Sequence, residues 1–354
     1  MFGQNGSILV EEITRKTSGP QDTLGRHLQD LRISVTDRCN FRCLYCMPLD
    51  EYTWIRKAEI LTFEEIVRLA RIFVDLGVRK IRLTGGEPLV RQDLPILVRQ
   101  LAGLQGLSEL SLTTNGAYLA DLAPDLKAAG LKRVNVSIDS LDAQKFKKIT
   151  KRGDLAKVLA GVFTANRIGL RPIKINAVIE KGLNDDEILS LADFGRIHLF
   201  SMRFIEYMDV GNANSWRSDK IVTKAEILSI IRRQYPLREM GRSGGTAPAV
   251  DFEYVDGRGD VGVISSVTEP FCFGCTRARL TADGRLVTCL FSEKGFDLKS
   301  PLRQGATDQQ LSSMIQGIWE KRVDRYSEER LEALTANQYD ASHRRKIEMI
   351  SLGG

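Results

Sequence analysis

The sequence predicts an α/β protein, an incomplete (β/α)6 TIM-like barrel closed by a smaller C-terminal α+β domain. Three observations lead to this prediction. Short apolar runs alternate with helix-like runs over the first 222 residues, polar residues occupy every second position of those apolar runs, and the pattern changes after about residue 223. Strands that are joined through helices run parallel, and the helices cover the outside of the sheet.

Six strands are expected in the first part of the chain, over residues 30–36, 80–85, 109–115, 133–139, 171–179 and 200–208. Helices are expected between them over about 62–77, 93–103, 154–168 and 185–197. Thr62, with Glu65 three residues later, predicts a capping box for the first of these helices. Six βα units in a row make a partial barrel the natural closure, and a doubly wound open sheet is the competing layout.

One face of each predicted strand is polar. Arg32, Ser34 and Thr36 share a face, and Lys174 and Asn176 do so on the fifth strand. Parallel strands that are covered by helices on both faces are nearly all apolar. The polar face must therefore point into a wet or liganded interior, which a barrel wide enough to hold a small molecule explains and an ordinary packed barrel core does not.

The last third of the chain follows a different pattern. A helix is expected over 223–235, then hairpin strands over 251–255 and 261–267 with a turn at Asp256 and Gly257, and a helix over 307–322. We therefore expect a flexible segment over 1–24, a barrel over 25–222, and a C-terminal domain over 223–354 that ends in Gly353 and Gly354.

Composition limits the function classes. A chain of 354 residues with 43% hydrophobic residues can bury a large core and is not globally disordered. It has no apolar run long enough to span a membrane and no secretory signal, so we expect a cytoplasmic protein without a membrane partner. The net charge of +6 favours an anionic partner such as a nucleotide, but the interspersed charges disfavour nucleic acid.

Six cysteines form two groups of three, and in a reducing compartment they favour metal sites over disulfides. The first group, Cys39, Cys43 and Cys46, directly follows the first strand. Three thiolates on one loop can hold three irons of a cubane and leave the fourth iron open to a ligand. A structural zinc site is the alternative, but it requires four ligands, and no fourth Cys or His lies near this loop.

The second group is Cys272, Cys275 and Cys289. Taken alone, it favours a zinc knuckle completed by a distant ligand. Beside the first group, a second [4Fe–4S] cluster with an open iron becomes the better interpretation. Arg277 and Arg279 share one face of an extended segment directly after it, and forked guanidinium groups suit phosphate or carboxylate oxygens.

These motifs resemble a known superfamily. The spacing of Cys39, Cys43 and Cys46, with Tyr45 before the last cysteine, is similar to that of radical S-adenosylmethionine (SAM) enzymes. Gly85-Gly86-Glu87-Pro88, at the end of the next strand, resembles the motif that holds the amino group of SAM in that superfamily.

The resemblance becomes narrower when both cysteine groups are considered. The run from Thr36 to Cys43, the run from Cys272 to Leu280 and the terminal Gly-Gly together resemble the GTP 3′,8-cyclase family. That family carries out the first step of molybdenum cofactor (molybdopterin) biosynthesis, and the resemblance covers the chain from about residue 24 to its end. The family fold is an incomplete six-unit barrel closed by a domain with the second cluster.

The resemblance implies cofactors, reaction and site residues. Two [4Fe–4S] clusters would be held by Cys39, Cys43 and Cys46 and by Cys272, Cys275 and Cys289, and SAM would be the cosubstrate. A 5′-deoxyadenosyl radical would abstract the ribose C3′ hydrogen of GTP and give (8S)-3′,8-cyclo-7,8-dihydro-GTP. SAM would contact Tyr45, Gly86, Ser137 and Met208. GTP would contact Arg32, Arg82, Thr113, Lys174, Arg277, Ala278 and Arg279, of which Arg32, Lys174 and Arg279 are the expected catalytic residues.

The resemblance also implies partners. GTP is the expected substrate, cyclic pyranopterin monophosphate synthase the expected enzyme downstream, a flavodoxin- or ferredoxin-like protein the expected reductant, and a homodimer the expected assembly. The terminal Gly353 and Gly354 would reach toward the active site.

Two alternative functions are left open. A peptide-modifying radical SAM enzyme would typically carry more C-terminal cysteines than three. A zinc-containing nucleic-acid-binding protein is suggested by the charge and the second cysteine group, but it would normally show a clustered basic face. Gly257 to Gly262 matches a GxGxxG pattern, yet it precedes a strand and opens no helix, so a hairpin turn is the better interpretation.

Overall fold

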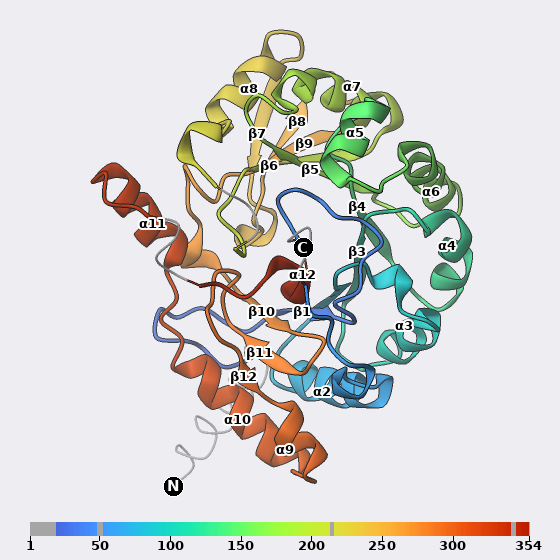
Figure 1. Ribbon diagram of the computed structural model, residues 1–354, viewed down its shortest axis with the longest axis vertical. Coiled ribbons are helices and arrows are strands. Elements are labelled where there is room, and N and C mark those ends of the chain that lie inside the picture. The colour runs from blue at the N-terminus through green and yellow to red at the C-terminus, as the bar shows by residue number, and fades with distance from the viewer. Residues whose placement is uncertain (1–18, 48–51, 213–215, 341–344, 354) are drawn as a thin grey trace, which may run out of the picture.

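The computed structural model describes residues 19–47, 52–212, 216–340 and 345–353. Its centre is one 12-stranded sheet in the order β12-β11-β10-β1-β2-β3-β4-β5-β6-β9-β8-β7. The strands curl around α12, and helices α2 to α7 lie on the outside of the curve (Figure 1). The predicted α/β fold with a partial barrel is confirmed, and the predicted flexible segment over 1–24 lies outside the described residues up to residue 18.

The strands are β1 (Asp30–Ser34), β2 (Lys80–Thr84), β3 (Glu109–Thr114), β4 (Arg133–Ser137), β5 (Lys174–Ile179), β6 (Ser201–Glu206), β7 (Leu237–Gly241), β8 (Val250–Tyr254), β9 (Asp260–Ile264), β10 (Arg277–Leu280), β11 (Arg285–Val287) and β12 (Phe296–Asp297). The helices are α2 (Phe63–Asp75), α3 (Leu94–Ala102), α4 (Leu119–Ala128), α5 (Ala143–Thr150), α6 (Leu155–Arg167), α7 (Ile188–His198), α8 (Lys224–Arg232), α9 (Lys299–Arg303), α10 (Asp308–Glu320), α11 (Tyr326–Thr335) and α12 (Met349–Leu352). Among the described helices, none has both the length and the apolar composition that crossing a membrane requires.

The six barrel strands are all present and run parallel from β1 to β6. The sheet is not closed, because β12 and β7 are its two edges. The strands that follow residue 223 extend it at both ends: β10 pairs in parallel with β1, and β9 pairs in parallel with β6. The C-terminal strands therefore join the barrel sheet instead of closing it, since both barrel edges offer unpaired backbone groups.

Local sequence rules explain several elements. Glu65 N donates to Thr62 Oγ1 and Thr62 N donates to Glu65 Oε2, which confirms the predicted capping box of α2. β8 and β9 form the predicted antiparallel hairpin, and Gly257 has the positive φ of 75° that its turn requires. Helix α4 was not singled out from the sequence, and it contains Pro124.

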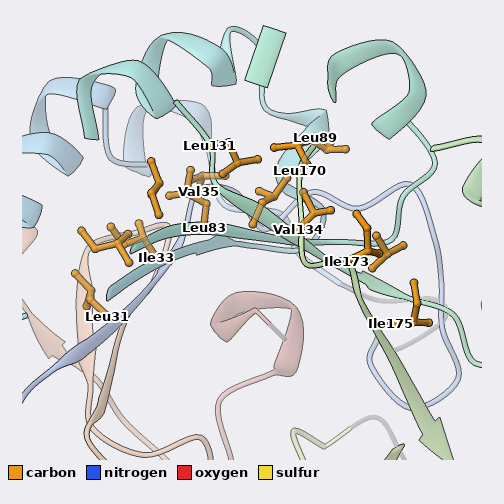
Figure 2. Packing of buried hydrophobic residues seen from close by; sticks show 14 of the residues in the cluster. Leu31, Ile33, Val35, Leu83, Leu89, Leu131, Val134, Leu170, Ile173 and Ile175 are labelled. Atoms are coloured by element: carbon orange, nitrogen blue, oxygen red, sulfur yellow. The ribbon is translucent and has the colours of Figure 1, made fainter. Parts of the chain in front are cut away.

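Apolar and polar residues alternate along the strands, and they lie on opposite faces of the sheet as predicted. Figure 2 shows Leu31, Ile33, Leu83 and Val134 on the side of the strands that faces the outer helices, where they are at most 1% exposed. Because successive strand residues point to opposite faces, the residues between them point to the concave side. The apolar core thus lies between sheet and helices, and the concave side is left to polar residues.

Candidate active site

The pairing of β1 with β10 places the two cysteine groups at opposite ends of one strand pair. Arg32 is in register with Arg279, and Asp30 with Arg277. Cys275 precedes the start of β10, whereas Cys39 follows the end of β1. Since the two strands are parallel, the groups are separated by about 13 Å of strand, at roughly 3.3 Å per residue. Arg32 and Arg279 lie between them.

The first cysteine group lies on a loop that is tied to its surroundings by backbone and side-chain hydrogen bonds. Arg42 N donates to Thr150 O over 3.0 Å, and Leu44 N donates to Ile149 O over 3.1 Å, both at the end of α5. Asn115 Nδ2 donates to Asn40 Oδ1 over 2.7 Å. These contacts hold the loop without using any of the three thiols as a partner in a disulfide.

Tyr45 contacts the end of a neighbouring strand. Its hydroxyl donates to Asp139 Oδ2 over 2.6 Å, and Asp139 Oδ1 accepts from Val178 N over 2.8 Å. Burial raises the pKa of Asp139 to about 6 against the opposing effect of these hydrogen bonds. Tyr45 therefore connects the thiol loop to the carboxyl ends of β4 and β5, where barrel enzymes keep their sites.

Gly85 and Gly86 let the loop after β2 pack directly on the loop after β1. A Cβ on Gly86 would lie 2.5 Å from both Asp37 O and Arg38 O, and Gly86 N donates to Thr36 O over 2.8 Å. No larger residue fits without moving the segment that leads into Cys39. The glycines of this motif thus position the thiol loop as well as leaving the backbone open to a ligand.

Glu87, from the same motif, has its carboxylate engaged within the protein. It accepts from Leu89 N over 3.0 Å, from Thr114 Oγ1 over 2.6 Å and from Asn115 N over 2.7 Å. Burial raises its pKa to about 7 in spite of these three donors. The carboxylate thereby braces the loops after β2 and β3, and a contact of this motif with the amino group of SAM stays a prediction.

In the second cysteine group, Cys275 lies beside two arginines, whereas burial raises the pKa of Cys289 to about 12. Arg277 Nη2 donates to Cys275 Sγ over 3.3 Å, and Arg322 Nη1 donates to Cys275 O over 2.7 Å. Burial opposes ionisation of the thiol, but Arg277 and Arg322 outweigh it and lower the pKa of Cys275 to about 6. A thiolate is the form that binds iron, so this environment favours a metal ligand.

Each group offers three cysteines that form no disulfide. A cubane binds each thiolate through a different iron, so three thiolates on each side would leave one iron of each cluster open.

A row of arginines crosses the concave side between the groups. Arg279, Arg32 and Arg82 are neighbours on β10, β1 and β2 in a continuous register. Burial, followed by mutual repulsion, lowers the pKa of Arg82 to about 9 and that of Arg279 to about 10, and it lowers the pKa of Arg32 well below its usual value. Among the described residues, no carboxylate forms an ion pair with these three. Three guanidinium groups in one row have the charge and the hydrogen-bond donors that a multiply charged anion requires.

Two further predicted contacts lie on the same side of the sheet. Thr113 is 8% exposed, and its Oγ1 is buried without a hydrogen-bond partner among the described residues. Lys174 is half-buried, and burial together with the nearby Arg203 and Arg133 lowers its pKa to about 8. A polar ligand would stabilise both groups, because it would give the Thr113 hydroxyl a hydrogen-bond partner and the buried Lys174 ammonium a negative charge nearby.

The other predicted contacts are placed less uniformly. Ala278 points to the opposite face and is fully buried in the core, so only its main chain can face a ligand. Ser137 ends β4 in register with Asn176. Met208 follows β6 and packs against two small apolar clusters, one with Tyr207 and one with Val210. Contacts of these residues with SAM or GTP stay a prediction.

The C-terminal tail enters the site. Helix α12 lies inside the curve of the sheet (Figure 1), with Ile350 and Leu352 at 1% exposed. Arg279 Nη1 donates to Gly353 O over 2.6 Å. A Cβ on Gly353 would lie 2.1 Å from Thr84 Oγ1, so the tail presses on the carboxyl end of β2. Gly354 lies outside the described residues.

A buried ionic cluster fixes this tail to the end of β6. Asp209 accepts hydrogen bonds from Arg330, Tyr326, Tyr339 and Lys346, and the Lys346 Nζ–Asp209 O distance is 2.7 Å. Burial opposes ionisation of Asp209, but Arg330 and Lys346 lower its pKa to about 2. Sequence reasoning missed this cluster, because its members are distant in the chain and none belongs to a motif.

Sequence reasoning also missed Arg322, Asp139 and Asn115. Asn115 and Asp139 are the last residues of the strands predicted over 109–115 and 133–139, and their position at strand carboxyl ends was a usable indication. Nothing in the sequence indicated Arg322, which reaches Cys275 from the loop after α10.

Comparison with known proteins agrees with this geometry. Residues 33–195 match the model of the Radical SAM superfamily, and residues 200–328 match Molybdenum Cofactor Synthesis C. SuiB of Streptococcus suis, solved both alone and bound to S-adenosylmethionine, superposes with a TM-score of 0.57 at 16% identity, over 92% of this chain and 72% of its own. Fold and site define a radical SAM enzyme.

Relatives that match nearly the full length of the chain show to which family of radical SAM enzymes it belongs. The GTP 3′,8-cyclase of Acidothermus cellulolyticus is 47% identical over 94% of this chain and 99% of its own length. That of Staphylococcus saprophyticus is 43% identical over 98% of this chain and 100% of its own. The chain belongs to the GTP 3′,8-cyclase family, with the iron–sulfur and SAM cofactors that were predicted. This membership excludes both alternative functions, the peptide-modifying enzyme and the zinc-containing nucleic-acid binder.

Proposed function

We propose that this enzyme is a lyase that converts GTP to (8S)-3′,8-cyclo-7,8-dihydro-GTP, the first step of molybdenum cofactor biosynthesis. The observation that carries the proposal is the row of Arg279, Arg32 and Arg82 between two groups of three thiols. Buried cations without carboxylate partners are costly until an anion binds. The triphosphate of GTP is such an anion. A ligand bound to this row lies between the two cysteine groups and can reach toward both.

The barrel segment and the C-terminal segment would bind different cofactors. Residues 25–222 would hold the first cluster and SAM, and residues 223–354 would hold the second cluster on the substrate side. When bound, the first cluster supplies one electron that cleaves SAM to methionine and the radical that removes the ribose C3′ hydrogen. The protein holds GTP and SAM in reacting geometry.

Each polar side chain of the concave side has a proposed task. Arg32, Arg82, Arg277, Arg279 and Lys174 bind phosphate oxygens through charge-assisted hydrogen bonds. Thr113 donates its unpaired hydroxyl to the ligand. The main chain at Ala278 passes the same ligand. Arg32, Lys174 and Arg279 also hold the substrate in place during ring closure.

SAM would bind where the loops after β1, β2, β4 and β6 meet. Gly86 offers its backbone, Ser137 its hydroxyl, and Met208 an apolar contact. Tyr45 acts through its hydrogen bond with Asp139, which holds the thiol loop against the end of β4.

We also propose the cellular setting. A low-potential carrier of the flavodoxin or ferredoxin kind supplies electrons, cyclic pyranopterin monophosphate synthase uses the product, and the enzyme works in the cytoplasm as a homodimer. The basic composition, with a net charge of +6, supports an acidic electron carrier.

The test is an anaerobic assay of protein reconstituted with iron and sulfide, given SAM and dithionite, in which 5′-deoxyadenosine is measured with and without GTP. We expect GTP to stimulate its formation and to be consumed to a cyclised product. 5′-Deoxyadenosine that does not respond to GTP would reject the cyclase but keep SAM cleavage. Its absence from fully iron-loaded protein would reject both. A Cys43→Ser variant, which removes one cluster ligand, is the negative control.

A further inference from the structure

One surface beside the first cysteine group is strongly basic and has no use in the chemistry above. It consists of Arg38 and Arg42 from the thiol loop and of Lys147, Lys148, Lys151 and Arg152 at the end of α5. All are exposed except Arg42, which is half-buried. We call these six residues the basic surface.

The basic surface is attached to the cluster ligands themselves. Arg42 lies next to Cys43, and its Nη1 donates to Cys39 O over 2.8 Å. Arg42 N also donates a hydrogen bond to the carbonyl oxygen of Thr150, the last residue of α5. A protein bound on these side chains would therefore lie against the loop that carries all three thiols of the first group.

Most of its charges have no ion-pair partner among the described residues; the exception is Arg38, whose Nε lies 3.8 Å from Asp37 Oδ1. Within the described chain, Lys147, Lys148, Lys151 and Arg152 form no ion pair with a carboxylate. The guanidinium groups of Arg38 and Arg42 both stack on Trp54, at 4.8 and 5.2 Å from its ring centre. Stacking holds these two cations in place at low entropic cost.

The surface over the second cysteine group is different. A cavity of 780 Å³ reaches Cys289, but its rim carries Lys294, Lys321, Arg322 and Arg325 against Glu293, Asp324 and Glu329. Arg322 is paired with Asp22 and Asp324, and Arg325 with Glu328. A nearly balanced rim exerts little attraction on a charged protein at a distance.

We propose that the basic surface is the docking site of an acidic protein that carries one electron at low potential, with a flavin or an iron–sulfur centre. This inference rests on the proposed function, because that function requires one electron at the first cluster for each SAM cleaved. The carrier is oxidised by one electron and the first cluster is reduced by one electron, and no proton or other group is exchanged. Charge complementarity between the surfaces accelerates association and orients the carrier.

The test compares two double variants with the same change in charge. Lys147→Glu with Lys148→Glu reverses two charges of the basic surface, and neither side chain contacts a thiol. Lys132→Glu with Arg167→Glu is the matched control, because these exposed residues lie before β4 and at the end of α6, at the opposite end of the barrel. Circular dichroism and thermal melting verify that both variants fold.

The first readout is binding, measured by surface plasmon resonance between full-length reconstituted enzyme and a purified acidic flavodoxin. We expect the double variant at α5 to lose at least tenfold in affinity, mainly through a slower association rate, and the control to stay within twofold. Raising NaCl from 50 to 300 mM should weaken wild-type binding and reduce the difference between the proteins. Wild-type affinity in the α5 variant overturns the proposal.

The second readout separates docking from chemistry. With flavodoxin and its reductase as electron source, the α5 variant should form 5′-deoxyadenosine at least tenfold more slowly than the control, whereas with dithionite the two should be equal. Equal losses with both reductants would make the effect structural and overturn docking. If the double variant Lys294→Glu with Lys321→Glu lost binding instead, the carrier would dock beside the second cysteine group, and the proposal would also be overturned. Failure to cyclise GTP with dithionite would contradict the proposed function, while the binding readout would still decide the docking site.

Discussion

Arg279 donates a hydrogen bond to the carbonyl oxygen of Gly353 over 2.6 Å. The donor is one of the three arginines in the row between the cysteine groups, and the acceptor lies next to the last residue of the chain. The tail thus touches the group that is proposed to bind the triphosphate, and Asp209 fixes the same tail further upstream through Lys346.

Deleting Gly353 and Gly354 should lower turnover at least tenfold. One charge-assisted hydrogen bond in a buried site contributes about 1.5–3 kcal/mol, and 1.4 kcal/mol corresponds to about a factor of ten. Iron content should not change, because none of the contacts of Gly353 is with a thiol. The measurement is product formation per iron. Unchanged turnover would remove the tail from the mechanism.

Arg279→Ala and Lys174→Ala should each raise the KM for GTP by about tenfold or more and leave the KM for SAM nearly unchanged, because both side chains lie on the substrate side. Arg285→Ala is the matched control, since Arg285 lies on β11 and pairs with Asp283. Equal effects on both KM values would contradict the assignment of these residues.

The KM for GTP should rise with pH. Burial and neighbouring cations lower the pKa of Lys174 to about 8. The ammonium is present below that pH and is lost above it, so phosphate binding weakens between about pH 7.5 and 9. Lys174→Arg should move this part of the profile to higher pH, because a guanidinium holds its proton more tightly than an ammonium. A profile that is identical in wild type and Lys174→Arg would count against this role.

Gly86→Ala should deplete the first cluster selectively. The new Cβ would lie 2.5 Å from two backbone oxygens of the segment that leads into Cys39, so the thiol loop must move. We expect about half of the wild-type iron after reconstitution, since the second group is untouched. Gly103→Ala is a suitable control, because no atom lies closer than 3.5 Å to a Cβ there. Full iron in Gly86→Ala would show that the loop tolerates the shift.

Asp209→Asn should destabilise the protein by about 3 kcal/mol or more, because it leaves the buried charges of Arg330 and Lys346 without their counterion. Cation partners lower the folded-state pKa of Asp209 to about 2, below its usual value, so its contribution is complete above about pH 4 and is lost as the pH falls toward 2. Chemical denaturation of wild type and variant at pH 7 and pH 3 measures both effects. If the free energies of unfolding of the two proteins differed by the same amount at pH 7 and pH 3, the predicted direction of the pH dependence would be wrong.

Local patterns were sufficient to predict much of this structure. Thr62 with Glu65 indicated where α2 begins, and the alternation around Arg32 and Lys174 indicated the polar side of the sheet. The spacing of the cysteines indicated the cofactors. These predictions succeeded because each depends on residues that are close in sequence.

Long-range pairing was beyond the same reasoning. Arg279 was expected on an extended segment, but nothing near it in sequence indicates that the segment lies beside β1. The contact of Arg322 with Cys275 and the cluster around Asp209 depend on how separate elements pack, which periodicity does not encode. The bracing role of Glu87 was missed because its motif suggested a ligand, whereas three donors of the protein itself surround the carboxylate.

The register of Arg32 with Arg279 also governs how the chain is made. The first barrel strand leaves the ribosome with one edge unpaired, and the strand that covers it follows roughly 250 residues later, on the order of 10–50 s at about 5–20 residues per second. An open strand edge during that interval is a template for association with other chains. Nascent chains that stop before residue 280 should therefore need chaperones to stay in solution, and the second cysteine group is complete only when translation has passed Cys289.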